Sequence, residues 1–160
     1  MNGAAQVAVS AVATFGFALI FRVKPRDLPL AAAGGAMAWG VRLLAGAWSG
    51  SDPMAYFIAA IAVGLYAELV ATMMRTPATV IIVASIIPLV PGGGMFYTMS
   101  QATAGDAIAA ATTGFATLML AGAIAAGLAV AAAIARLAPR GLRQRARLRR
   151  PATPRDRNAV

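Results

Sequence analysis

The stretch SIIPLVPGGGMFYTM, residues 85–99, interrupts an apolar run that is otherwise long enough to cross a membrane. It holds two prolines and three consecutive glycines, namely Pro88, Pro91, Gly92, Gly93 and Gly94. Proline removes a backbone donor and clashes with the preceding helical turn, and glycine adds backbone freedom. Because freed backbone groups in a bilayer must be satisfied by protein or by a water-filled cavity, the stretch predicts a broken membrane helix with a binding site.

The composition around this stretch is that of a membrane protein. Of the 160 residues, 60% are hydrophobic and 12% are charged, and the mean hydropathy is +0.75, which is too apolar for a soluble domain. The chain has no cysteine and no histidine, so it lacks thiolate ligands, the commonest general base and the commonest metal ligand. We therefore expect no metal, no cofactor and no enzymatic activity.

Five apolar segments can each cross a hydrocarbon core of about 30 Å at about 1.5 Å per helical residue. They cover residues 3–21, 28–48, 54–74, 78–103 and 107–137. The predicted fold is an all-α, polytopic transmembrane helix bundle of about five spans, with the fourth broken at Pro88 to Gly94. Residues 1–137 form the predicted transmembrane domain, and residues 138–160 form a basic, largely disordered cytoplasmic tail.

The charges lie mainly in the connections between these segments, and they alternate in sign. In chain order they are Arg22, Lys24 and Arg26 with Asp27, then Asp52, Arg75, Asp106 and the arginine-rich tail. Because basic loops stay in the cytoplasm, this pattern predicts an outside N-terminus and a cytoplasmic C-terminus. The tail follows a membrane helix and has no aromatic platform, so we expect it to bind anionic lipids and no nucleic acid.

The residues around the break suit a small polar ligand. A helix that restarts near Met95 would offer N–H groups to a substrate carboxylate, and unwound carbonyls from Leu89 to Pro91 would suit a cation. Tyr97 follows the break and suits a cavity wall, although tyrosine is also common at the membrane interface. The alternative for the whole stretch is a kink that only shapes helix packing.

Two charged residues lie inside spans. Glu68 is the one carboxylate there, and burial favours the protonated form of a carboxyl group, so Glu68 is a candidate carrier of the coupling proton. Arg42 lies at about the depth of the three glycines and is a candidate for binding a substrate carboxylate bidentately. The alternatives are structural: Glu68 pairs with Arg75 or Arg42 or reaches the interface, and Arg42 pairs with Glu68, Asp52 or backbone carbonyls.

The fifth segment carries small residues at a spacing of four, which favours close packing against a neighbouring helix. They are Ala109, Thr113, Thr117, Ala121, Ala125, Ala129 and Ala133.

Three features carry a family resemblance: IIPLVPGGGMFYTM, the arginine in the second span, and RTPATV at the start of the fourth. Over about residues 8–136 the chain resembles the threonine/serine exporter (ThrE) family, and more closely its YjjB-like small subunit of a two-component exporter. The resemblance implies a YjjP-like membrane subunit as partner and a place in the bacterial inner membrane. It also implies export of threonine and serine, or of dicarboxylates such as succinate. Pro88, Pro91 and Gly92 match the family's motif, whereas Gly93 and Gly94 extend it.

The residues and the resemblance together predict a membrane subunit of a proton-coupled secondary exporter of small hydrophilic metabolites. One alternative is a non-transporting accessory subunit that stabilises its partner. The other is an intramembrane enzyme, which would need a serine or a pair of carboxylates.

Overall fold

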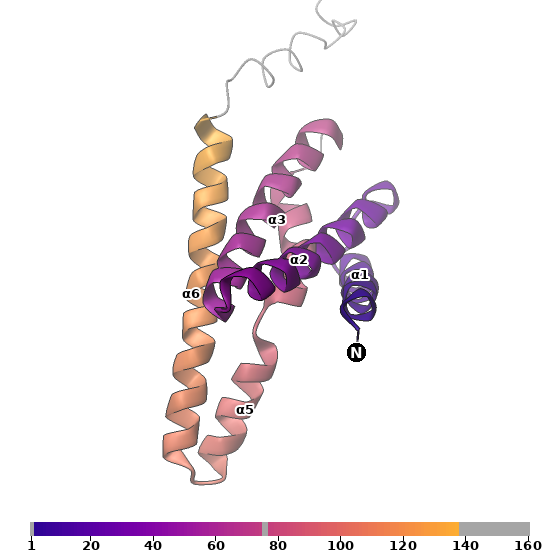
Figure 1. Ribbon diagram of the computed structural model, residues 1–160. Helices are drawn as coiled ribbons and strands as arrows, with labels where there is room; N and C mark the ends of the chain where they lie inside the picture. The colour runs from indigo at the N-terminus through magenta and orange to yellow at the C-terminus, as the bar shows by residue number, and fades with distance from the viewer. Residues whose placement is uncertain (1, 75–76, 138–160) are drawn as a thin grey trace, which may run out of the picture.

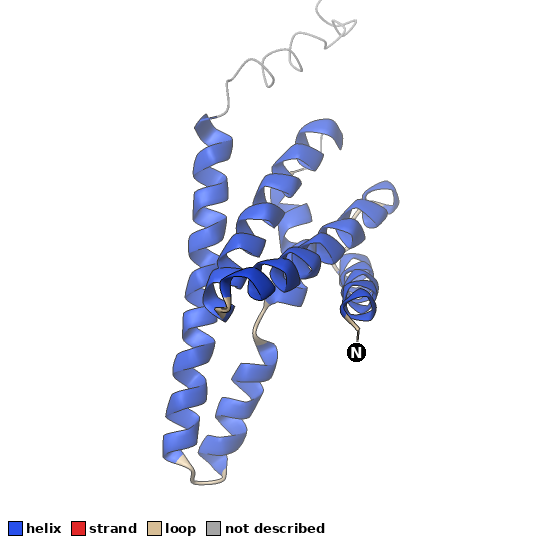
Figure 2. Ribbon diagram, viewed as in Figure 1, coloured by secondary structure: helices blue, strands red, loops and turns tan. Residues whose placement is uncertain are grey.

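The computed structural model describes residues 2–74 and 77–137, and this part of the chain contains helices and short connections without a strand (Figures 1 and 2). Two 3-10 turns, η1 (Pro25–Asp27) and η2 (Ile87–Leu89), accompany the α-helices. The α-helices are α1 (Gly3–Ile20), α2 (Leu28–Ser49), α3 (Asp52–Met74), α4 (Ala78–Ile86), α5 (Gly92–Thr103) and α6 (Ala107–Leu137). Arg75 and the predicted tail, residues 138–160, lie outside the described residues.

Four helices, α1, α2, α3 and α6, are long and apolar enough to cross a membrane. The segment Thr79–Leu89 and helix α5 form a fifth, bent candidate, with 52° between their axes. The prediction of an all-α, multi-pass helix bundle with a broken fourth span is therefore confirmed.

Small residues fill the interior of the bundle, and α3 lies at its centre, packed against α2, α4 and α6. Most of the buried hydrophobic residues of the bundle are alanines, and large apolar side chains such as Trp48 and Phe115 are exposed. At helix crossings the contact is often a glycine against a neighbouring side chain, as with Gly35 against Thr14 and Gly64 against Ala131. Close approach of backbones at small residues is the usual way in which helices pack in lipid, where burial of apolar surface gives little driving force.

The packing face of α6 differs from the predicted stripe of small residues. Its buried residues are Ala110, Thr117, Ile124, Gly127 and Ala131, of which only Thr117 belongs to the stripe. The stripe residues Ala125, Ala129 and Ala133 are exposed. A spacing of four winds around a helix with 3.6 residues per turn, whereas the observed spacings of three, four and seven keep one face toward the neighbouring helices α5 and α3.

The connection between α1 and α2 lies at the same end of the bundle as the last turn of α3. Arg26, between α1 and α2, donates a hydrogen bond from Nη2 to the Met74 carbonyl oxygen at the end of α3, at 2.9 Å. Helix α6 also ends on this side (Figure 1). The basic connection between α1 and α2 therefore lies at the end of the bundle where α3 and α6 end.

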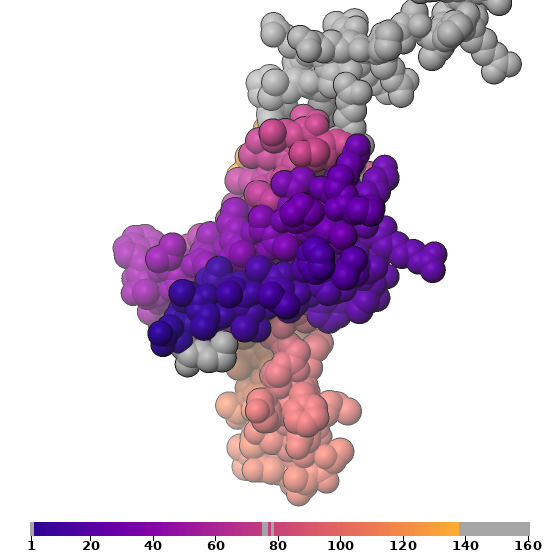
Figure 3. All heavy atoms as spheres, turned by 90° about the vertical axis from the view of Figure 1, so that its right-hand side faces the viewer, coloured from indigo at the N-terminus to yellow at the C-terminus, as the bar shows by residue number. Residues whose placement is uncertain are grey.

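The two acidic connections do not lie at one level. Helix α3 begins beside Ala116 of α6, where Asp52 and Ala116 line the same cavity. From there α6 continues to Ala107, which is about 14 Å at 1.5 Å per residue. The hairpin of α5 and α6 therefore projects beyond the rest of the bundle (Figures 1 and 3).

Candidate functional site

The break between α4 and α5 is a tight turn centred on Pro91. Pro91 has φ −77° and ψ 54°, and the Gly92 N–H donates to the Val90 carbonyl oxygen at 2.7 Å, which is an inverse γ-turn. Helix α5 begins at Gly92, and the Met95 N–H donates to the Pro91 carbonyl oxygen at 3.2 Å. The expectation that the helix restarts near Met95 is therefore wrong, because the three glycines already form the first turn of α5.

The three glycines have different surroundings. A side chain at Gly94 would collide with Thr117 of α6, so Gly94 lets the two helices of the hairpin approach closely. A Cβ atom at Gly92 or Gly93 would meet no atom within 4 Å. None of the three glycines has a positive φ, so none of them is required by the backbone conformation. Gly94 instead permits close helix packing, and Gly92 and Gly93 leave open space beside α5.

This difference gives a matched pair of substitutions. We expect Gly94→Leu to separate α5 from α6 and to destabilise the hairpin, because the Thr117 side chain occupies the space that leucine needs. The cost should be about 1–3 kcal/mol, as for overpacking elsewhere. Gly93→Leu should leave folding unchanged and so tests whether the open face binds substrate. Thermal unfolding in detergent measures the first effect, and ligand binding measures the second. Equal stability of the two variants would contradict the assignment.

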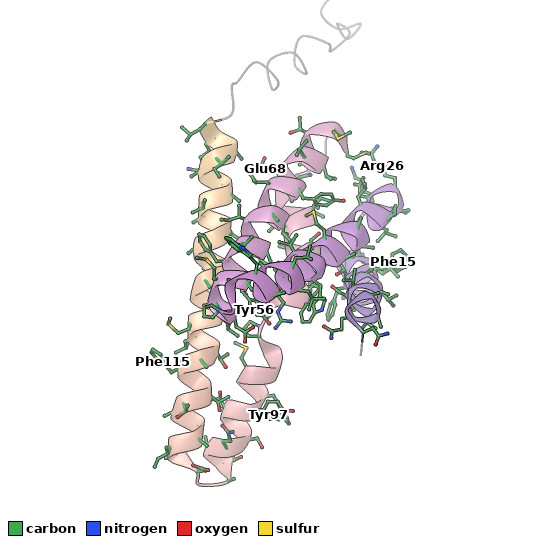
Figure 4. All side chains as sticks on the ribbon, in the orientation of Figure 1. Phe15, Arg26, Tyr56, Glu68, Tyr97 and Phe115 are labelled. Carbon is green, nitrogen blue, oxygen red and sulfur yellow. The ribbon has the colours of Figure 1, made fainter. Side chains whose placement is uncertain are left out.

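The other residues of the break have separate positions. Pro88 lies in η2, next to the fully buried Leu89, which packs in one core cluster with Tyr56 and Ala59. Tyr97 is 60% exposed and contacts Phe96 edge to face, with 5.7 Å between ring centroids. Figure 4 shows Tyr97 on the projecting hairpin, pointing away from α6. The residues before the break are thus anchored in the core, and Tyr97 faces outward.

Arg42 is held between α2 and α3 by aromatic rings and an acidic residue. Its Cζ atom lies 4.8 Å from the centroid of the Trp39 ring and 5.1 Å from that of Tyr56, both within cation–π range. Its Nη2 lies 3.4 Å from Oδ1 of Asp52, and its Nε is buried with no hydrogen-bond partner. Of the structural partners that the sequence suggests for Arg42, Asp52 is the one that the structure places beside it.

A cavity of about 360 Å³ opens beside this ion pair. Its lining comes from the end of α2 and the start of α3, namely Arg42, Leu43, Gly46, Ala47, Gly50, Ser51 and Asp52. A second cavity of about 450 Å³ shares Asp52 and is otherwise lined by Pro53, Phe115, Ala116, Met119 and Leu120. Neither cavity is lined by residues 88–97, so the structure does not join Arg42 and the break in one described cavity.

Glu68 lies toward the opposite end of α3 from Asp52, separated from it by about 24 Å of helix. It is partly buried and projects on the side of α6 (Figure 4). Arg42 and Glu68 therefore do not form the pair that the sequence left open. The structure places the candidate proton carrier and the candidate anion-binding residue at different levels of the same helix pair.

Hydroxyl groups that the sequence did not single out tie α2 to its neighbours. Ser10 of α1 donates to the Gly35 carbonyl oxygen at 2.8 Å, and Tyr66 of α3 donates to that of Leu30 at 2.8 Å. Asp52 was considered only as a structural partner, and its position as the acidic residue of the α2–α3 connection is the signal that could have marked it as a site residue.

The comparison with known proteins agrees with this architecture. A family model described as "Threonine/Serine exporter, ThrE" matches residues 6–134, which include the break and all or most of each of the five apolar segments. No solved structure matches the chain. Since the match covers well over half of its length, the chain belongs to the threonine/serine exporter family of membrane transporters.

Proposed function

We propose that the chain is a subunit of a proton-coupled secondary exporter in a bacterial inner membrane. It would move threonine, serine or another small hydrophilic metabolite, such as the dicarboxylate succinate, out of the cell. The observation that carries this proposal is Arg42, a charged residue within a membrane helix that lines a cavity with an unsatisfied Nε. Charged groups at such positions are costly and usually mark a substrate path.

The geometry of Arg42 supports carboxylate binding. Cation–π contact with Trp39 and Tyr56 occupies the face of the guanidinium group and fixes its orientation. The edge of the group is what binds a carboxylate, through two parallel N–H···O bonds. A substrate carboxylate would therefore bind Arg42 in the cavity at the outer end of α2.

The break supports a moving part of the transport path. The 52° bend concentrates the change of direction at Val90 and Pro91, and the faces of Gly92 and Gly93 are open. Large φ and ψ changes in a few residues between rigid helices are how hinges work. In this proposal Pro88, Pro91 and the three glycines let α5 swing relative to α4, and Tyr97 lines the path on the hairpin.

A second membrane subunit of the YjjP-like type is part of the proposal. The projecting hairpin exposes large apolar side chains on both of its helices, including Phe96, Met99, Phe115 and Leu118. Of the helices in the described residues, α5 packs mainly against α6, so its other faces are open to lipid or to a second membrane protein. The basic end of the bundle would face the cytoplasm, with the N-terminus outside, and the arginine-rich tail would bind anionic lipids there.

Glu68 is proposed to carry the coupling proton, and its substitution tests this. In vesicles that hold the exporter, acidifying the receiving side should accelerate wild-type threonine efflux. In Glu68→Gln this acceleration should disappear, and the driven rate should fall about tenfold or more, which corresponds to about 1.4 kcal/mol in the barrier. Glu68→Asp keeps the carboxyl group and should keep the pH response. An unchanged pH response in Glu68→Gln would remove the coupling role.

A further inference from the structure

We infer that Arg42 and Asp52 together bind the zwitterionic head of an α-amino acid, with the carboxylate on Arg42 and the ammonium group on Asp52. The inference rests on the proposed transport function. It adds a second binding residue and selects one substrate class, amino acids rather than dicarboxylates. Four observations on the described residues carry it.

The first observation is that the Arg42 guanidinium group has unused binding capacity. Its contact with Asp52, at 3.4 Å from Nη2 to Oδ1, is longer than the 2.7–2.9 Å of a strong charge-assisted hydrogen bond. Its Nε is buried and makes no hydrogen bond. A buried donor without a partner is unfavourable, so a rotation of the side chain that brings Nε to the cavity and onto a ligand oxygen would be favoured.

The second observation is that Asp52 remains available to a ligand. Its side chain is 70% exposed, compared with 22% for Arg42, so most of the carboxylate is not committed to the ion pair. Asp52 lies in the first turn of α3 and lines the same cavity of about 360 Å³ as Arg42. An ammonium group in this cavity would have a negative partner within reach of the arginine edge.

The third observation is the charge balance of the cavity. Among the residues that line it, Arg42 and Asp52 are the charged ones, and their charges cancel. A zwitterion can place each of its charges against an opposite one. A dicarboxylate would instead bring one carboxylate to Arg42 and hold its negative charge near Asp52, which like-charge repulsion disfavours.

The fourth observation is the second cavity, of about 450 Å³, which Asp52 shares. Its other lining residues are Pro53, Phe115, Ala116, Met119 and Leu120, and none of them is charged. An amino acid held by its ammonium group at Asp52 can direct a short side chain here. A second carboxylate would find no hydrogen-bond donor among these side chains and would lose solvation.

Competition experiments on the full-length chain in inside-out membrane vesicles of its native host test the inference. The vesicles take up labelled threonine, and the competitors are unlabelled threonine, N-acetylthreonine, threonine methyl ester and succinate. N-acetylthreonine lacks the ammonium group, and the ester lacks the carboxylate. With wild-type protein, each of the last three should compete at least about tenfold more weakly than threonine, as expected for loss of a charged partner.

Variants then locate the ammonium site. In Asp52→Asn the inhibition constant of threonine should rise about tenfold and that of N-acetylthreonine should stay the same, so the preference between them disappears. Asp52→Glu keeps the charge and should restore most of the preference. Asp106→Asn is the matched control, because Asp106 is an exposed aspartate before α6 whose Oδ1 accepts a hydrogen bond from the Ala109 N–H at 2.9 Å. Asparagine also caps helices well, so this control should behave as wild type.

The outcomes separate the inference from the proposed function. If the wild-type exporter transports threonine but N-acetylthreonine or succinate competes equally well, the inference is wrong, whether or not any variant folds. If Asp52→Asn lowers uptake without changing the preference, Asp52 has a structural role and the inference is again wrong. If vesicles with the chain take up no more threonine or succinate than vesicles without it, the proposed function itself fails.

Discussion

Substituting leucine for Gly127 should abolish accumulation of the folded protein in the membrane. A Cβ atom at Gly127 would lie 2.5 Å from the Phe57 carbonyl oxygen and 2.8 Å from the Ala60 Cβ, both on α3. The first of these is a backbone atom, so no side-chain rotation can make room, and α3 and α6 must separate. Overpacking that displaces a whole helix should cost about 3 kcal/mol or more, which is a large share of the stability of a domain of this size.

The control for this substitution lies on the same helix. Gly122 is five residues away and has no atom within 4 Å of an added Cβ, so Gly122→Leu should accumulate as the wild type does. Membrane fractionation with detergent-extracted size-exclusion profiles would measure both variants. If the Gly127→Leu variant accumulated at the wild-type level and eluted as a single monodisperse peak, α3 and α6 would not pack as described.

Arg42→Lys should reduce threonine export about as severely as Arg42→Gln, by about 100-fold or roughly 2.7 kcal/mol. Lysine keeps the charge but loses the planar fork, and with it both the bidentate carboxylate geometry and the stacking on Trp39 and Tyr56. Initial rates of threonine efflux, normalised to the amount of protein in the membrane, would measure the loss.

A second arginine provides the control for Arg42. At the other end of the bundle, Arg26 donates a hydrogen bond to the Met74 carbonyl oxygen, and its Nε lies 3.4 Å from Oδ1 of Asp27. A lysine can also donate a hydrogen bond and carries the same charge. Arg26→Lys should therefore export normally. Wild-type rates in Arg42→Lys would mean that Arg42 acts as a simple positive charge, and the bidentate role would have to be abandoned.

The helices and the break could be predicted from sequence because their signals are local. Apolar length fixes the spans, and Pro88, Pro91 and the glycines fix the place where the fourth span bends. The detail of the break could not be predicted, because a glycine can adopt both an unwound and a helical backbone and the difference between them is small. Contact with Thr117 on another helix decides that Gly94 serves close packing.

The candidate site depended on contacts between segments, which explains what the sequence left open. Arg42 has three aromatic or acidic neighbours, Trp39, Tyr56 and Asp52, and two of them lie on α3. Whether Asp52 or Glu68 is the partner of Arg42 depends on which end of α3 lies beside Arg42. The hydropathy of the sequence does not predict this contact. The two acidic connections differ in level by about 14 Å, at about 1.5 Å of helix rise per residue. This difference could not be predicted either, because it also depends on how the helices pack.

An interior of alanine and glycine reverses the usual sensitivity to mutation. In most soluble domains, truncation of core side chains to alanine reveals what holds the fold together. Here most buried positions are already alanine or glycine, and many of the bulky side chains face outward. An alanine scan would thus leave the buried alanines untested, whereas a scan that adds bulk would trace the helix contacts residue by residue.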